Sequence, residues 1–280
     1  MKTNMKKPVN IPVDKLRPFE GHPFKVKDDE EMNTLIESIQ TTGILSPLIA
    51  RPIENTDEYE VISGHRRLHA AVKAGITKVP ALIYALDRDS AAIAVVDSNL
   101  HREHILPSEK AFAYKLKMEA VNHQGVTCGH VGHKSRDDVS DTKSGRTVQR
   151  YIRLTNLIPE LLDLMDEGKI ALMVGEALSY LGDEEQYAVL EQCEINDCTP
   201  SYSQAVEMKK RFQAGQLSAY DIGEIMSREK ANQRETIKIP KERIEPYIPK
   251  GLNSKQTVDF FCKACEHYQK YLKKQKEYER

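Results

Sequence analysis

The sequence predicts an α+β protein in which a small mixed α/β domain precedes an all-α domain and a small C-terminal helical module. Between residues 9 and 100, helical spacing of apolar residues alternates with short apolar strands bounded by glycine and proline. After Pro107 the apolar spacing stays helical to about Ser227. The predicted domains are residues 1–104, 105–227 and 228–280.

In the first domain, a helix is predicted from the acidic residues at Asp28 to Gly43, because Met32, Leu35, Ile36 and Ile39 recur at helical spacing. Strands are predicted in "ILSPLIARPI", "EYEVIS" and "KVPALIYAL". A second helix follows Gly64 and ends at Gly75, with a buried stripe of Leu68, Ala71 and Val72. A third helix is predicted over Ala91 to Leu100.

The second domain is predicted to begin with a helix that Ser108 caps. A loop then covers "HQGVTCGHVGHKS", and two short helices surround a turn in "DVSDTKSGRTVQRYIRLTNL". Further helices are predicted at Pro159 to Glu167, Ala171 to Leu181 and Asp183 to Cys193. The last segment opens with an extended "IKIPKERIEPYIP" and ends in a lysine-rich helix.

The composition argues against a secreted protein with a disulfide framework and against a membrane-spanning protein. The 280 residues include 41 Lys and Arg against 42 Asp and Glu, so attraction to a polyanion must come from local clusters of charge. Five cysteines give no even disulfide framework, and the N-terminal lysines precede no apolar run. No stretch reaches the length that spans a bilayer. We therefore expect a cytoplasmic protein that is not in a membrane.

Two arginines stand where a helix begins, in "ISGHRRLHAA". A strand, a glycine turn and a helix leave the first helical N–H groups free to bind an anion. Adding Arg66 and Arg67 to this positive helix end costs up to about 1 kcal/mol unless a negative group lies between them. A phosphate would remove the conflict, and pairing with nearby carboxylates is the alternative.

Three segments resemble the motifs of the ParB partition family: "SGHRRLHAA" its GERR-type box, "TTGILSPLIARP" its glycine-then-proline box, and "SNLHREHILPSEKAFAY" its third box. Members of that family bind a cytidine nucleotide, usually CTP with magnesium, which closes a dimer into a clamp on DNA. The resemblance implies a base-side wall at Gly43 and Pro47, and a third wall at Asn99 and Arg102. It implies a triphosphate cradle formed by Gly64, His65, Arg66 and Arg67.

Two residues depart from the family pattern. His65 and Ser98 stand where the family commonly has glutamates, and the second of those glutamates helps to hold the metal. Losing a carboxylate removes a charged oxygen ligand from a magnesium site. The possibilities left open are a weak CTPase, weak metal binding, and nucleotide binding without turnover.

A DNA-contacting helix is predicted in "SGRTVQRYIRL", within a helix-turn-helix at about residues 135–154 whose first helix is "SRDDVSD". Arg146, Gln149, Arg150 and Arg153 share one face, and Val148 and Ile152 point to the other. Arginine and glutamine reach phosphates and purine edges, while the apolar face packs on its own domain. The alternative is a solvated basic face in a helical bundle.

The sequence therefore predicts a homodimeric partition protein that binds double-stranded DNA, is switched by CTP and acts with a ParA-type ATPase. A transcriptional regulator of a mobile element is the first alternative, favoured because residues 237–280 do not resemble the family's usual dimerisation tail. A nuclease is the second, although no carboxylate cluster supports it. The set Cys128, His130 and His133 lacks a fourth ligand at suitable spacing, and the pair Cys262 and Cys265 lacks a second matched pair, so we expect no structural metal.

Overall fold

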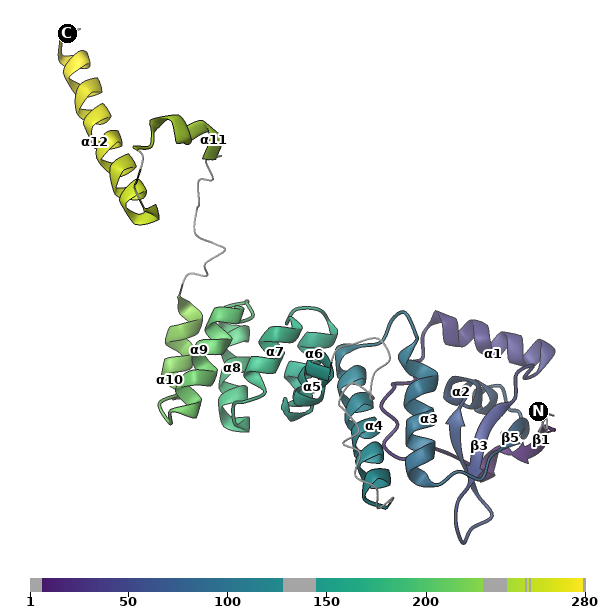
Figure 1. The fold of residues 1–280 in the computed structure, drawn as a ribbon. Coiled ribbons are helices and arrows are strands. Elements are labelled where there is room, and N and C mark those ends of the chain that lie inside the picture. Colours follow the sequence, from purple (N-terminus) through teal and green to yellow (C-terminus); the bar gives the residue numbers. More distant parts are fainter. Residues whose placement is uncertain (1–6, 128–144, 229–240, 250, 252, 279–280) are drawn as a thin grey trace. The chain divides into compact units, whose positions relative to one another are not determined.

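The computed structural model describes residues 7–127, 145–228, 241–249, 251 and 253–278. The chain divides into two compact units, Met1–Arg228 and Glu229–Arg280 (Figure 1). The α+β prediction is confirmed, because a mixed sheet with its helices comes first and everything described after it is helical or irregular. No described helix is long and apolar enough to cross a membrane.

A five-stranded sheet forms the centre of the N-terminal part, in the order β1-β5-β3-β4-β2. Its strands are β1 (Val9–Pro12), β2 (Leu16–Pro18), β3 (Leu48–Pro52), β4 (Tyr59–Ser63) and β5 (Lys78–Ile83). β3 runs antiparallel to β4 and parallel to β5, while the edge strands β1 and β2 pair antiparallel with β5 and parallel with β4. The edge strands lie in segments that were not predicted as strands, because each has three or four residues and contains proline.

Helices cover both faces of the sheet. Val61 faces a core shared with Leu68 and Ala71 of α2 (His65–Lys73), whereas the next residue, Ile62, packs with Ala91 of α3 (Arg88–Leu100). The alternation of strand side chains explains this division. The helix α1 (Glu30–Thr42) then packs on α2, around buried residues that comprise Met32, Ile39 and Ala70.

Two details of these helices differ from the prediction. Val72 is 56% exposed and does not belong to the buried stripe, which Ala70 completes instead. The helix α3 begins at Arg88, three residues before the predicted start, because Asp87 caps it by accepting a hydrogen bond from the Ser90 backbone N–H at 2.7 Å.

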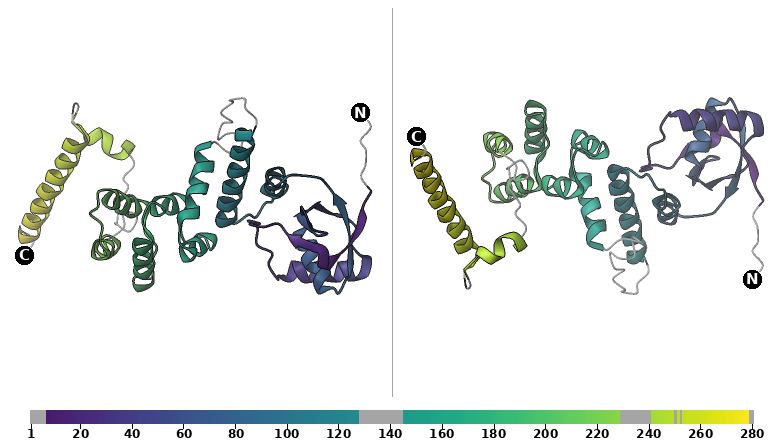
Figure 2. Two further views of the ribbon diagram at one scale, coloured as in Figure 1. Left: turned by 90° about the horizontal axis from the view of Figure 1, so that it is seen from below. Right: turned by 90° about the horizontal axis from the view of Figure 1, so that it is seen from above.

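The rest of the first unit consists of helices that share a separate core. They are α4 (Pro107–Thr127), α5 (Gly145–Arg153), α6 (Pro159–Asp166), α7 (Leu172–Leu178), α8 (Asp183–Ile195), α9 (Tyr202–Gln213) and α10 (Ala219–Ser227). The views in Figures 1 and 2 show α8, α9 and α10 grouped together, and α10 packs against the other two. Leu161, Leu178, Met208 and Ile225 are among the fully buried side chains of this core.

Ser108 does not cap α4, which begins at Pro107. Its hydroxyl and its backbone N–H both donate to the carboxylate of Asp166 in α6, at 2.5 and 2.9 Å. The predicted first helix of the helix-turn-helix and most of the histidine-rich loop lie outside the described residues.

The second unit contains α11 (Lys241–Ile244) and α12 (Ser254–Tyr278). The lysine-rich helix is confirmed as α12. The extended prediction for residues 237–249 is wrong from Lys241 to Tyr247, where α11 and a turn of 3-10 helix stand. Pro246 lies within the first two positions of the 3-10 turn, where a backbone N–H would have no partner inside the turn.

Candidate functional site

An open cavity of about 680 Å³ lies beside the start of α2. Cationic side chains from three segments line it: Lys25 and Lys27 precede α1, Arg66 is in α2, and Arg102 follows α3. The complete lining is Phe24, Lys25, Lys27, Asp29, Glu31, Arg66, Arg102, Glu103, His104, Ile105, Leu106 and Glu109. The volume suits a ligand of nucleotide size, and four cations are available to its negative groups, although four carboxylates share the lining: Asp29, Glu31, Glu103 and Glu109.

Arg66 is held at the cavity by two carboxylates at the start of α1, the cap residue Asp29 and Glu31 of the first turn. Its guanidinium nitrogens lie 3.3 Å from Asp29 Oδ1 and 3.2 Å from Glu31 Oε2. The pairing expected of an arginine with no other ligand is therefore present, but the side chain of Glu31 is 80% exposed. Ion pairs this exposed contribute less than about 1 kcal/mol, so an anionic ligand can displace the carboxylates at little cost.

Arg102 brings a second guanidinium to the same cavity, and its backbone N–H donates to the Asn99 carbonyl at 3.1 Å. The pKa of Arg102 is lowered, first by burial and then by the positive charge of Arg66, while Glu109 opposes the shift. Two mutually repelling cations beside open space favour a ligand whose negative charge they share.

Arg67 contacts the chain rather than the cavity. It donates to the backbone carbonyls of Ser46 and Pro47, the latter at 3.0 Å, and burial lowers its pKa. Gly64 adopts φ of 103°, and a Cβ at this position would lie 3.1 Å from both Arg67 Nη2 and Leu48 Cγ. The glycine and the arginine together fix the segment before β3 against the start of α2.

His65 packs behind this turn, with its ring centroid 3.7 Å from that of His22. Its Nε2 accepts a hydrogen bond from the Phe19 backbone N–H at 3.3 Å, so the ring is neutral. The pKa of His65 is lowered to about 3, mainly by burial and further by His22 and Arg102. Burial also lowers the pKa of His22, whose Nε2 has no hydrogen-bond partner within the described parts of the chain.

Acidification is expected to destabilise this part of the protein. An unfolded histidine has a pKa near 6.5, but His65 titrates at about 3 in the fold, so below pH 6.5 the unfolded chain binds a proton that the folded chain does not. The contribution is complete above pH 6.5 and is lost progressively as the pH falls. Between pH 7 and 5.5, the free energy of unfolding in urea should fall by about 1 kcal/mol through His65. The variant His65→Gln should lose this part of the decrease, and retaining all of it would contradict the assignment.

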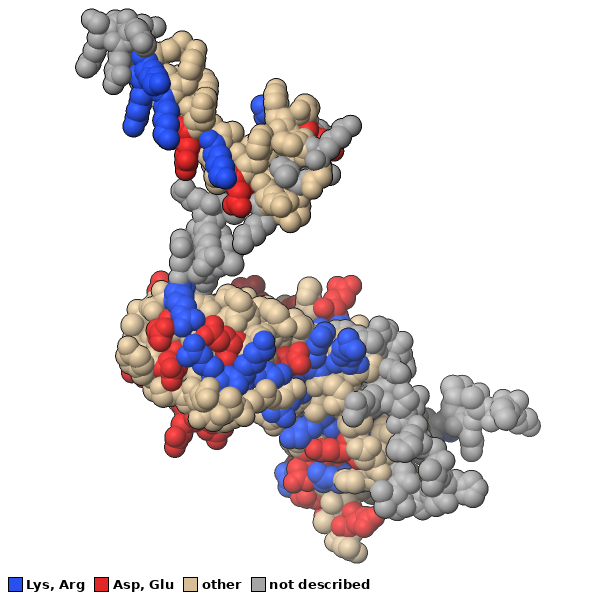
Figure 3. Space-filling view, turned by 60° about the vertical axis from the view of Figure 1, so that its left-hand side comes forward, with Lys and Arg blue, Asp and Glu red and all other residues tan. Residues whose placement is uncertain are grey.

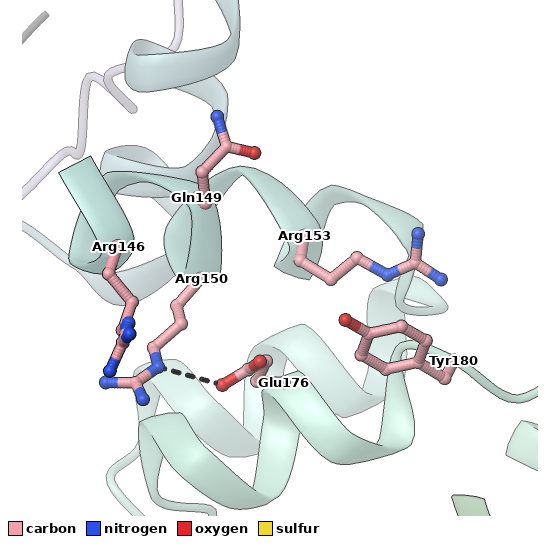
Figure 4. Close-up of a pocket in the computed structure, with 6 residues that line it drawn as sticks. All are labelled: Arg146, Gln149, Arg150, Arg153, Glu176 and Tyr180. Atoms are coloured by element: carbon pink, nitrogen blue, oxygen red, sulfur yellow. Dashed lines mark ion pairs between the residues drawn. The ribbon is translucent and has the colours of Figure 1, made fainter. Parts of the chain in front are cut away.

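A second open cavity, of about 490 Å³, lies between α5 and α7. Its lining is Arg146, Gln149, Arg150, Arg153, Glu176 and Tyr180, which include all four residues predicted to contact DNA. In Figure 4, Arg146 and Arg150 extend side by side toward α7, and Gln149 extends away from Glu176. Val148 is fully buried against Tyr114 of α4, as predicted for the apolar face, and Ile152 is half-buried there.

The arginines of this cavity differ in their contacts. Arg150 Nε lies 3.0 Å from Glu176 Oε2. Arg153 donates to the Ser179 carbonyl at 3.1 Å, and its guanidinium carbon lies 4.1 Å from the ring centroid of Tyr180. Arg146 has no carboxylate partner among the side chains that the structure describes. Arg146 is therefore the arginine that is most available to a phosphate.

Comparisons with known proteins decide the family. The family described as the ParB N-terminal domain matches residues 1–100. The chromosome-partitioning protein Spo0J of Thermus thermophilus is 33% identical over 205 residues, which cover 73% of this chain and 71% of that protein. The chain belongs to the ParB family. A nucleoid occlusion protein of Bacillus anthracis is 34% identical over 185 residues, 65% of this ParB chain and 60% of that relative.

Solved ParB structures from Caulobacter crescentus are more distant. One, complexed to the centromeric parS site, has 22% identity and a TM-score of 0.43, and covers 78% of this chain and 98% of its own. Another, complexed with CTP-γ-S, has 25% identity and a TM-score of 0.32, and the match covers 66% of this chain and 97% of that structure's chain.

The residues predicted for the nucleotide site in this ParB chain do not all reach the cavity. Arg66 and Arg102 line it, and Gly64, Pro47 and Arg67 form the adjoining turn. Gly43 ends α1 with φ of 73°. Asn99 is 4% exposed and donates through its side-chain amide to the Val95 carbonyl at 2.7 Å.

The site does not fit the magnesium ion that accompanies CTP in the family. Ser98, which the motif resemblance places where a metal-binding glutamate was expected, donates its hydroxyl to the Val95 carbonyl at 3.0 Å. The neighbouring Asp97 is paired with Lys117 at 2.6 Å. Both oxygens of Glu109 accept backbone N–H groups, from Lys25 and Leu106. Within the described residues, no group of three side chains is arranged to hold a metal ion.

Several site residues were missed by the sequence analysis. His22, Lys25 and Glu109 belong to the first site, and Glu176 and Tyr180 belong to the second. The pair of lysines in "FKVK", next to a predicted acidic helix start, was the available signal for Lys25. Glu176 and Tyr180 stand on an ordinary helical segment and its end, and nothing in their spacing marks them.

Proposed function

We propose that this ParB-family protein is a DNA-binding partition protein whose N-terminal cavity binds CTP. The DNA-binding part of the proposal depends on one observation. Arg146, Gln149 and Arg150 all belong to α5, and all three line the same open cavity. The space-filling view in Figure 3 shows a band of Lys and Arg side chains on one face of the first unit, with carboxylates beside it. With a net charge of −1, the whole chain offers no such attraction, so a local basic face is required.

Replacing Arg146 by alanine is expected to weaken binding to every duplex by a similar factor. Each phosphate contact releases counterions, so its loss should lower the slope of log K against log salt by about 0.9. Fluorescence anisotropy of a labelled duplex over a series of salt concentrations measures both quantities. The exposed Lys169, paired with Glu167 at 2.8 Å and outside the cavity lining, provides the matched control Lys169→Ala. An unchanged slope in Arg146→Ala would favour the solvated-face alternative.

The nucleotide part of the proposal is supported by the cavity beside α2. Arg66 and Arg102 meet there, and the backbone start of α2 lies next to them. Family membership indicates CTP as the ligand, and discrimination from ATP, GTP and UTP is measured by competition against labelled CTP. Because the residues at the family's metal position do not offer a carboxylate, we derive no step that depends on magnesium.

Lys25 joins the cavity beside α2 to the helices α4 and α6. Lys25 lines the nucleotide cavity, and its ammonium nitrogen lies 3.7 Å from Asp166 Oδ2 of α6. The backbone N–H of the same lysine donates to Glu109 of α4 at 2.9 Å. A bound triphosphate competes with Asp166 for Lys25, and this competition supports a switch in which nucleotide loosens the contact between α6 and the segment before α1.

A dimer is supported by the second unit. Along α12, a row at spacings of three and four holds Val258, Phe261, Cys265, Tyr268 and Leu272. This is the apolar pattern of a coiled-coil seam. Val258 and Tyr268 are each 61% exposed in the single chain, so association of two copies through α12 would cover them.

A further inference from the structure

The carboxylate of Glu176 is placed inside the DNA-facing cavity, where a negative charge needs an explanation. Glu176 is the one acid among the six residues that line it. Its side chain is 23% exposed and reaches Arg150 from α7, as the dashed line in Figure 4 shows. A carboxylate near DNA phosphates repels them and weakens binding. Its position in this cavity therefore calls for a second role.

The atoms that form the ion pair indicate this purpose. Glu176 Oε2 bonds to Nε of Arg150, which is the inner nitrogen of the guanidinium group. Among the contacts between described residues, the two terminal nitrogens have no carboxylate partner, and they form a fork that matches the O6 and N7 acceptors of a guanine edge. The ion pair at Nε also restricts the long side chain before DNA arrives, so less entropy is lost on binding.

Arg150 and Arg146 thus have different surroundings although they are one helical turn apart. Arg146 is exposed and has no described carboxylate partner, which suits contact with a phosphate. Arg150 has a side chain that is 31% exposed and is tied to α7, and a phosphate that approached it would also approach Glu176. Repulsion of this kind selects against backbone contacts and leaves base contacts as the favoured use of Arg150.

We propose that Glu176 is a specificity-determining residue, which orients Arg150 toward a guanine and opposes its use as a general phosphate contact. The inference rests on the proposed DNA-binding function of α5. Glu176 acts through Arg150 and is therefore a positioning residue. It enhances the ratio of specific to non-specific affinity rather than affinity itself.

The test compares two duplexes with full-length protein. Selection of bound sequences from a random pool with the wild type first identifies a preferred site, and a second duplex carries that site with its guanines replaced. Anisotropy titrations then give both affinities and both salt slopes for the wild type, Glu176→Ala and Glu176→Gln. The exposed Glu160, outside the cavity lining, supplies the control Glu160→Gln, which removes one negative charge elsewhere in the same helical region.

In Glu176→Ala, we expect the affinity ratio between the two duplexes to fall at least about 10-fold, the range of one guanine contact. Affinity for the second duplex should rise, and its salt slope should increase by about 0.9 as Arg150 turns to a phosphate. Glu176→Gln can still accept from Arg150 Nε, so it should retain part of the preference while gaining non-specific affinity.

Three results would overturn the inference: equal gains on both duplexes, which mean simple charge removal; equal losses with a lowered melting temperature, which mean a structural role; or unchanged affinities. A wild type that binds no DNA would overturn the proposed function itself and the inference with it.

Discussion

The variant Arg66→Ala is expected to bind CTP about 10- to 100-fold more weakly than the wild type. A hydrogen bond to a charged group is worth about 1.5–3 kcal/mol, and Arg66 lines the cavity with two carboxylate partners that a phosphate can replace. The repulsion between Arg66 and Arg102 is also removed, which offsets part of the loss. Equilibrium dialysis with labelled CTP measures the change directly.

The fold is expected to tolerate this replacement. Arg66 lies outside the apolar cores, and its partner Asp29 still caps α1 by accepting from the Met32 backbone N–H at 2.8 Å. Arg17 offers a matched control, because its side chain is 53% exposed and pairs with Glu58 away from the cavity. Arg17→Ala should leave CTP affinity unchanged. Undiminished binding in Arg66→Ala, with an unchanged melting temperature, would remove the nucleotide site from the start of α2.

Elements whose signals lie within one segment were predictable from the sequence. The helix α1 follows from its apolar spacing, the acidic residues at its start and the glycine at its end, and it was predicted within two residues of its observed bounds. The edge strands β1 and β2 depend on pairing with β5 and β4, which lie about 40 or more residues further along the chain. No local pattern reports such pairing, so the five-stranded sheet could be seen only in the structure.

The same distinction applies to the functional residues. Arg66 and Arg146 were identified because each belongs to a short motif with a basic pattern at the start of a helix. Arg67 belongs to the first motif, but its contacts with Ser46 and Pro47 depend on how β3 approaches α2. Arg150 and Glu176 are 26 residues apart in the sequence and belong to different helices. Their pairing depends on the packing of α7 against α5, which no local pattern reports. The motifs therefore predicted where basic residues cluster. The fold determined which of these residues pair with other groups of the protein.

The helical core contains one polar residue on which its stability should depend strongly. Gln186 of α8 is fully buried and makes three hydrogen bonds. Its Oε1 accepts from the Ile158 backbone N–H at 2.9 Å, and its Nε2 donates to the carbonyls of Asn156 and Leu181 at 3.0 and 3.1 Å. A single amide thus joins the start of α6 to the turn between α7 and α8.

Replacing Gln186 by leucine is expected to reduce the free energy of unfolding by about 3–5 kcal/mol. Leucine has a similar size, but it leaves the buried Ile158 N–H and the buried Leu181 carbonyl without their partner, and each such group costs about 1–3 kcal/mol. The carbonyl of the exposed Asn156 adds less to the loss. Urea unfolding followed by circular dichroism measures the loss. The exposed Gln213 at the end of α9 gives the matched variant Gln213→Leu, for which little change is expected.

The same variant separates stability from nucleotide binding. Gln186 and its partners Ile158 and Leu181 are buried in the helical domain, whereas the cavity beside α2 is lined by residues of the N-terminal part and the start of α4. At a temperature where Gln186→Leu is still folded, its affinity for CTP should equal that of the wild type. A loss of less than about 1 kcal/mol in stability would mean that the helices rearrange to satisfy these groups in another way.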